Sequence, residues 1–208
     1  MKEIANLVGV SLSSVSVWVR DVPLTAEQRK ALLWRDPAVN GQCVGAAANK
    51  ARARERREKY QDARRRLAQD GDVQHAAGCM LFWAEGSRQR NTVVFTNSDP
   101  EMVRFFAAFL RQHNGVPDGA FRVDCNLFAD HVERQRAIEQ FWLDTLELPS
   151  SCLRKSTVNV YSKYSQKKRK NRLPYGTVRV CVHSTELVQS IYGAIQEYGG
   201  FERPEWLG

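Results

Sequence analysis

The stretch Met80–Gln89, MLFWAEGSRQ, places a single acidic residue at the end of an apolar run. Large apolar side chains precede Glu85, and its two neighbours, Ala84 and Gly86, are small. An apolar run of this kind predicts a largely buried helix. A lone carboxylate at the end of such a helix contributes little to a core, so its presence points to a role outside simple packing.

The whole sequence has 208 residues, of which 43% are hydrophobic and 26% are charged, as expected of a globular fold with a sizeable core. No apolar run approaches the roughly 20 residues that span a bilayer. The first ten residues, MKEIANLVGV, lack the apolar stretch of a signal peptide. We therefore expect a soluble, cytoplasmic protein with no membrane partner. The five cysteines are dispersed without a CxxC pair, so we expect reduced and mostly buried thiols.

The formal net charge of +8 favours a polyanionic partner. Charge alone does not separate DNA from RNA or from an acidic lipid surface. The distribution of the basic residues along the chain is more informative, because many of them fall in residues 49–72 and 155–172.

The first twenty residues predict two short helices, over residues 2–8 and 12–20, separated by a turn at Gly9 and with Ser11 as N-cap of the second. Val10, Val15 and Trp18 are expected to face inward. This pattern is typical of a helix-turn-helix, with an ordinary helical hairpin as the alternative. The residues expected on the groove-facing side of a recognition helix are Ser13, Ser14, Ser16, Val17 and Arg20.

Three segments follow from the composition. We expect residues 1–34 to form a helix-turn-helix-like segment that reads DNA. A further helix is predicted at its end, starting at the capping box Thr25–Gln28. Residues 35–72 form a hinge rich in Pro and Gly (35–48) and then a basic linker helix, which either contacts phosphates or is simply a solvated helix. Residues 73–208 form an αβ domain.

The last segment alternates helices with strands. Helices are predicted over residues 100–114, 131–146 and 185–198, with Asp99 and Ser184 as N-caps of the first and third. Strands are predicted where apolar and polar residues alternate, at 92–97, 121–127, 155–163 and 177–183. The expected fold class is α+β, with a mostly antiparallel sheet covered by helices on one face.

The other face of this sheet carries hydrogen-bonding residues that suit phosphates and base edges, and a basic loop lies beside it. A plain solvated sheet is the alternative, and an RNA-binding sheet that uses Tyr161, Tyr164 and Tyr175 is another. The candidate DNA-binding residues of the sheet and loop are Arg88, Arg90, Arg122, Asn126, Lys155, Asn159, Tyr161, Lys163, Lys167, Lys168, Arg169, Lys170, Arg172, Arg179 and His183.

The segment GCMLFWAEGS, residues 78–87, followed by VVFTNSDPEMVRFFAAFL, resembles the LAGLIDADG homing endonucleases over about the last two thirds of the chain. The resemblance implies a motif helix ending in an acid–Gly pair, small residues where two such helices pack together, and curved sheets that form a saddle on DNA. By position, Glu85 matches the metal-binding acid of that family. Gly78, Ala84 and Gly86 match the small positions at or near the helix interface.

Besides the RNA-binding alternative, the sequence supports two functions that act on duplex DNA. The first is a sequence-specific double-stranded DNA-binding protein, a transcription regulator of the bacterial nucleoid that needs no cofactor for binding. The second is a Mg²⁺-dependent endonuclease in which Glu85 is the catalytic metal ligand. Because the chain has one such motif, a two-acid site requires a homodimer formed through the motif helix. The sequence contains no Gly-rich phosphate loop, HExxH motif or nucleophile elbow.

Overall fold

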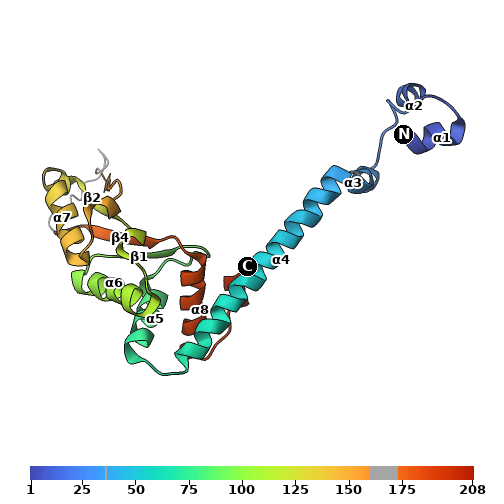
Figure 1. The fold of residues 1–208 in the computed structure, drawn as a ribbon. Helices are drawn as coiled ribbons and strands as arrows, with labels where there is room; N and C mark the ends of the chain where they lie inside the picture. Colours follow the sequence, from blue (N-terminus) through green and yellow to red (C-terminus); the bar gives the residue numbers. More distant parts are fainter. Residues whose placement is uncertain (36, 160–172) are drawn as a thin grey trace. The chain divides into compact units, whose positions relative to one another are not determined.

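The computed structural model describes residues 1–35, 37–159 and 173–208, and the chain divides into two units, Met1–Arg52 and Ala53–Gly208 (Figure 1). The described residues contain eight α-helices and one four-stranded sheet, so the fold is α+β as expected.

The first unit begins with α1 (Lys2–Val8) and α2 (Leu12–Trp18). Gly9 ends α1 with a φ of 70°, a left-handed conformation that glycine adopts without steric strain. The Ser11 hydroxyl accepts a hydrogen bond from the backbone N–H of Ser14 at 3.2 Å, so the predicted N-cap is confirmed.

The third helix, α3 (Ala26–Arg35), starts at the predicted capping box. The Thr25 N–H donates to Gln28 Oε1 at 2.9 Å, and the Gln28 N–H donates to Thr25 Oγ1 at 3.2 Å. Both partners of this box lie within four residues, which is why the sequence alone predicts it.

The α1–α2 pair buries Ala5 and Val15, and Val10 is half-buried. The predicted inward position of Trp18 is wrong, because this side chain is 58% exposed. Trp18 is the last residue of a two-turn helix, so the side chain extends past the region where the two helices touch.

The predicted hinge over residues 35–48 is corrected to a helix from Pro37 onward. Helix α4 runs from Pro37 to Ala68 and includes Gly41 and Gly45. Proline is tolerated at the start of a helix because its missing N–H would be unpaired there. Each glycine lowers the stability of the helix by about 1 kcal/mol relative to alanine. A long helix made mostly of strong helix-forming residues remains stable despite this loss.

The sheet of the second unit has the order β1-β4-β2-β3. Its strands are β1 (Val93–Asn97), β2 (Phe121–Phe128), β3 (Thr157–Asn159) and β4 (Thr177–Val182). Strand β4 is antiparallel to both β1 and β2, whereas β3 is parallel to β2. All four predicted strands are present, although the part of the third beyond Asn159 lies outside the described residues.

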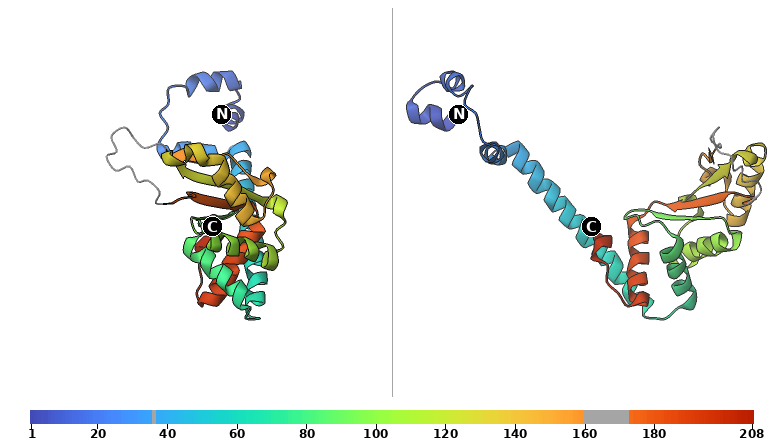
Figure 2. Two further views of the ribbon diagram at one scale, coloured as in Figure 1. Left: turned by 90° about the vertical axis from the view of Figure 1, so that its left-hand side faces the viewer. Right: turned by 180° about the vertical axis from the view of Figure 1, so that it is seen from behind.

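The helices of the second unit are α5 (Val73–Glu85), α6 (Pro100–Asn114), α7 (Gln135–Leu146) and α8 (Thr185–Gly199). Short 3₁₀ turns occupy Asp118–Ala120, Ala129–Arg134, Ser150–Cys152 and Pro204–Leu207. The predicted helix start at residue 131 is therefore corrected to Gln135, since the preceding turn is 3₁₀. Helices α5 and α6 pack against β1 on one side of the sheet (Figures 1 and 2).

The core between these layers is aromatic. Phe106 of α6 stacks on Phe95 of β1 with ring centroids 4.3 Å apart and on Phe82 of α5 at 5.7 Å. Asp99 and Ser184 cap α6 and α8 as predicted, each accepting backbone N–H bonds. Four of the five cysteines are buried and all five are free, in agreement with the expectation.

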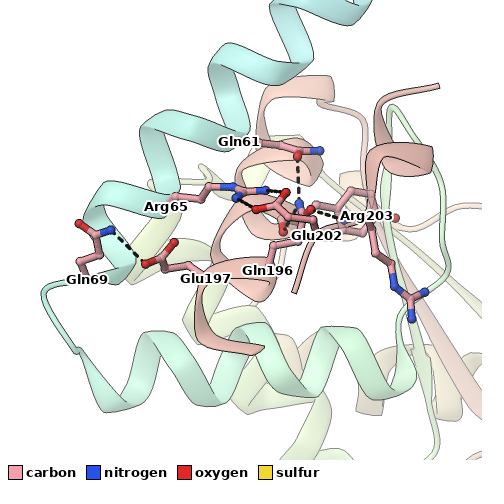
Figure 3. A network of polar contacts seen from close by, with 8 residues as sticks. Gln61, Arg65, Gln69, Gln196, Glu197, Glu202 and Arg203 are labelled. Atoms are coloured by element: carbon pink, nitrogen blue, oxygen red, sulfur yellow. Dashed lines mark hydrogen bonds and ion pairs between the residues drawn. The ribbon is translucent and has the colours of Figure 1, made fainter. Parts of the chain in front are cut away.

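The second half of α4 is built into this unit through buried glutamines. Gln61 Nε2 donates to Gln189 Oε1 at 2.7 Å. Gln196 Nε2 donates to Gln61 Oε1 at 2.9 Å (Figure 3). All three side chains are at most 3% exposed. A Cβ at Gly193 would lie 2.3 Å from the Gln61 carbonyl oxygen, so α8 needs glycine there for the two helices to approach.

Arginines of α4 extend the same junction. Arg65 forms a bidentate ion pair with Glu202 (Figure 3). Arg57 Nη1 donates to the Leu207 carbonyl at 2.9 Å. Arg64 Nη2 donates to Asn114 Oδ1 at 2.7 Å. These three cations are consequently part of the packing of the unit.

Titratable groups gather at the start of α5. His75 Nδ1 lies 2.7 Å from Tyr198 Oη, and His113 Nδ1 lies 3.7 Å from Asp72 Oδ2. Burial, helped by the nearby charges of Arg64 and His113, lowers the pKa of His75 from 6.5 to about 4, while Asp72 acts in the opposite direction.

This shift predicts a pH-dependent stability. Because the pKa of His75 is lower in the folded chain than in the unfolded chain, the unfolded chain binds more protons between pH 6.5 and about 4. The free energy of unfolding should therefore decrease as the pH falls through this window, with no contribution from His75 above it. Urea unfolding at several pH values measures the slope. His75→Asn should flatten it, and an equal slope in both proteins would contradict the assignment.

Candidate nucleic-acid interface

The strand register places two rows of side chains on the sheet surface opposite the core. In the first row Arg179 lies between Thr96 and Asp124, and in the second Asn126 lies between Thr177 and Thr157. We call these six residues the polar sheet face: Thr96, Asp124, Asn126, Thr157, Thr177 and Arg179. Val94 and Cys181 occupy the same side in the neighbouring row but are buried.

The centre of the polar sheet face is an ion pair between the two inner strands. Asp124 Oδ1 accepts a hydrogen bond from Arg179 Nε at 2.9 Å and lies 2.8 Å from Arg179 Nη2 in the ion pair. The Asp124 side chain is 8% exposed, whereas that of Arg179 is 50% exposed. Hydrogen bonding to Asp124 and attraction by its charge raise the pKa of Arg179. Asp124 is the one acidic residue in β1–β4, so the polar sheet face presents a cation to solvent.

Two of the three predicted residues near this face have local partners. Arg122 Nη1 donates to the carbonyls of Gly119 and Phe121, both at 2.6 Å, which turns its guanidinium toward the backbone. His183 is exposed, and its Nδ1 lies 3.3 Å from Thr92 Oγ1. Asn126 is half-buried within the polar sheet face.

Other predicted contacts lie at the rim. Arg88, Lys155 and Asn159 are exposed, and Arg90, also exposed, donates to the Gly208 carbonyl. The exposed Arg154, next to Lys155, was not among the predicted residues, although it belongs to the same basic segment. The remaining predicted loop residues lie outside the described part of the chain: Tyr161, Lys163, Lys167, Lys168, Arg169, Lys170 and Arg172.

Tyr175 is engaged inside the domain. Its ring stacks on Phe141 with centroids 3.8 Å apart, and its carbonyl accepts a hydrogen bond from Trp142 Nε1 at 2.8 Å. A ring held in this way has one face occupied, which limits its use as a stacking platform for an RNA base. Tyr161 and Tyr164 lie outside the described residues.

The predicted recognition residues of α2 are largely accessible. Ser13, Ser16, Val17 and Arg20 are exposed, and Ser14 is half-buried. The hydroxyls of Ser13 and Ser14 lie 2.7 Å and 2.9 Å from the hydroxyl of the N-cap Ser11. Ser16, Val17 and Arg20 therefore keep the most freedom to contact a ligand.

Helix α5 has an apolar surface that the described residues leave largely uncovered. Val73, Ala77, Leu81 and Ala84 follow one another at helical spacing; Leu81 is half-buried, the other three are exposed, and Val73 is 80% exposed. No Asp, Glu, Lys or Arg occurs between Val73 and Ala84. An apolar helix face is normally buried against another element. We call these four residues the open face of α5.

Glu85 lies at the C-terminal end of the open face of α5. Its side chain is exposed and makes no hydrogen bond or ion pair within the described residues. Residues 1–35, 37–159 and 173–208 contain no group of three or more His, Cys, Asp or Glu side chains placed to hold a metal ion. The described residues of one chain thus do not by themselves form a site with three such ligands.

Two of the three predicted interface residues have roles inside the domain. A Cβ at Gly78 would lie 2.3 Å from the Phe109 ring. Glycine at this position therefore lets α6 of the same chain pack closely against α5. Gly86 bridges to Phe95 in the sheet, and a Cβ there would lie 2.4 Å from the Phe82 ring. The prediction for Gly78 is corrected, because its position on α5 faces the core. Ala84 does lie on the open face.

Some basic residues of α4 bind partners within the second unit, and others are exposed to solvent. Arg57, Arg64 and Arg65 bind partners within the second unit, as described above. Arg54, Arg56 and Arg66 are exposed, and the exposed Lys59 pairs with Glu55 at 2.9 Å. Only the exposed arginines are therefore free to contact phosphates.

Comparisons with protein-family models, with curated proteins and with solved structures gave no match for this chain. In the described parts of the chain, no helix is both long enough and apolar enough to cross a membrane.

Proposed function

We propose that this protein is a sequence-specific double-stranded DNA-binding protein, a transcription regulator that combines a helix-turn-helix with a LAGLIDADG-like domain. The observation that carries the proposal is the polar sheet face, where a half-exposed arginine lies among hydrogen-bonding residues and the one strand carboxylate is already paired. Basic residues at the rim add phosphate contacts, which supply most of the salt-dependent affinity for DNA.

The N-terminal helix pair supports the same function. Ser16, Val17 and Arg20 form an exposed edge on α2, the helix that corresponds to the reader in a helix-turn-helix. The function then has two contact regions, one in each unit of the chain.

A second function is favoured by one observation, the exposed Glu85 at the end of the open face of α5. Two chains packed through this face about a twofold axis would bring two Glu85 carboxylates toward one another. Carboxylate oxygens are preferred ligands of Mg²⁺, and a metal bound there would stabilise charge on a scissile phosphate. This alternative is a homodimeric LAGLIDADG-type endonuclease.

The test is selection from a randomised duplex DNA library, with Mg²⁺ and separately with EDTA, followed by sequencing of bound and cut molecules. For a regulator we expect an enriched motif and intact DNA in both buffers, with Glu85→Gln unchanged or slightly tighter because a charge near phosphate is removed. Mg²⁺-dependent cuts that vanish in Glu85→Gln would instead establish the nuclease. Glu205→Gln, an exposed acid on a 3₁₀ turn, is the matched control.

Absence of any enriched duplex motif would contradict both functions. The same selection with single-stranded RNA then distinguishes an RNA-binding sheet from a protein without nucleic-acid ligand.

A further inference from the structure

Arg179 occupies the middle of the sheet. Its strand, β4, has β1 on one side and β2 on the other, and its register partners are Thr96 and Asp124. When a sheet lies against a duplex, its rim is nearest the phosphates and its centre is nearest the base edges in the groove. The position of Arg179 therefore favours contact with a base over contact with a phosphate.

The geometry of the ion pair leaves one edge of the guanidinium available. A guanidinium carries five N–H donors in a fixed plane. The Asp124 carboxylate accepts the Nε donor at 2.9 Å and forms an ion pair with Nη2 at 2.8 Å, so both contacts lie on one edge of the guanidinium. The remaining donors, on Nη1 and Nη2, make no hydrogen bond within the described residues. They form a planar fork on the opposite edge of a side chain that is 50% exposed.

The burial of Asp124 indicates what the pair is for. Taking a carboxylate out of water is unfavourable, and a buried ion pair is often no more stable than an apolar pair of the same volume. A buried acid that binds two nitrogens of one arginine does, however, restrict the rotamers of that side chain. An unrestrained arginine would lose this rotational freedom on binding, so the pair reduces the entropy lost when a ligand is bound.

We infer that Arg179 reads a guanine in the major groove through its Nη1/Nη2 fork, and that Asp124 is the positioning residue that holds this fork toward the DNA. Guanine presents two acceptors, O6 and N7, at a spacing that arginine binds in a bidentate manner, whereas adenine suits Asn or Gln. The inference rests on the proposed function, since it assigns one base contact within the polar sheet face.

The test compares the binding motifs of variants selected from the same randomised duplex library. Arg179→Lys keeps the positive charge but removes the fork. It should lower the preference for G·C at one position of the motif by about 5- to 150-fold, while other positions and the salt dependence stay unchanged. Asp124→Asn should weaken the preference at the same position by a smaller factor, a change that a purely structural role would not confine to one base pair.

The rim provides the matched control. Lys155→Ala should weaken binding by the same factor at every position of the motif and reduce the salt dependence, as expected for a phosphate contact. Circular dichroism and thermal unfolding check that each variant is folded. If Arg179→Lys is unfolded, the neutral pair Asp124→Asn with Arg179→Gln replaces it and should lose the guanine preference at that position.

Several results would overturn the inference. These are an unchanged motif in the folded Arg179 variant, a uniform loss of affinity like that of Lys155→Ala, or an Asp124→Asn motif identical to that of the wild type. Failure of the wild-type protein to enrich any duplex motif would be a different result, because it contradicts the proposed function itself.

Discussion

Gln189→Leu should lower the free energy of unfolding by about 3–5 kcal/mol. The Gln189 side chain is fully buried and makes three hydrogen bonds. It accepts from Gln61 Nε2 at 2.7 Å and donates to the carbonyls of Arg90 at 3.0 Å and Trp206 at 3.2 Å. Leucine has a similar volume but leaves all of these partners unpaired, and each buried orphan costs about 1–3 kcal/mol.

Urea unfolding of the two proteins measures this difference, and hydrogen exchange of residues 53–68 shows whether α4 loses protection. Gln69→Leu is the matched control, because Gln69 also lies at this junction and donates to Glu197, but in an exposed position (Figure 3). The control should change stability by less than about 0.5 kcal/mol. A Gln189→Leu protein within that same range would show that the glutamines do not hold α4 in place.

Features encoded by neighbouring residues were predictable from the sequence. The N-caps Ser11, Asp99 and Ser184 and the box at Thr25 involve residues two or three positions apart, so composition alone reveals them. The strands were found for a similar reason, since alternation with a period of two reports one buried face.

Contacts between distant segments were not predictable in the same way. The stripe of α4 that packs on α8 and on the residues after it includes Arg57, Gln61 and Arg65, and residues of these types normally indicate a solvated face. The hinge at residues 35–48 was inferred from one proline and two glycines, which the helix tolerates. Gly78 matched an interface position in sequence, but the phase of α5 turns it toward Phe109.

The candidate site shows the same division. Alternation in β4 was sufficient to place Arg179 on the polar side of the sheet. Assigning a role to Asp124 required knowledge of the register of β2 against β4. This register sets Asp124 opposite Arg179, although the two residues are 55 positions apart in the sequence. The sequence alone does not show which basic residues of α4 bind partners within the second unit and which are exposed to solvent.

Ala77→Glu should abolish self-association and weaken DNA binding by about 100-fold or more, if two copies of this chain pair through the open face of α5. Ala77 is exposed and lies in the middle of that face, so a longer side chain there can extend into solvent in the monomer. In a twofold dimer the two new carboxylates would lie near the axis, where they would be desolvated and repel each other. Loss of the dimer also removes one of two linked DNA contacts.

Sedimentation equilibrium of the wild type and the variant measures the association, and binding to the selected duplex measures its consequence. Ala137→Glu makes the same substitution on an exposed position of α7 and should leave both unchanged. Thermal unfolding should be similar for all three proteins, because neither alanine belongs to the core. A wild type that is monomeric both free and on DNA, or an Ala77→Glu protein that still dimerises, would exclude the open face of α5 as the contact. Glu85 would then lack a twofold partner, so the endonuclease alternative would fail together with the dimer, whereas DNA reading by a monomer would be unaffected.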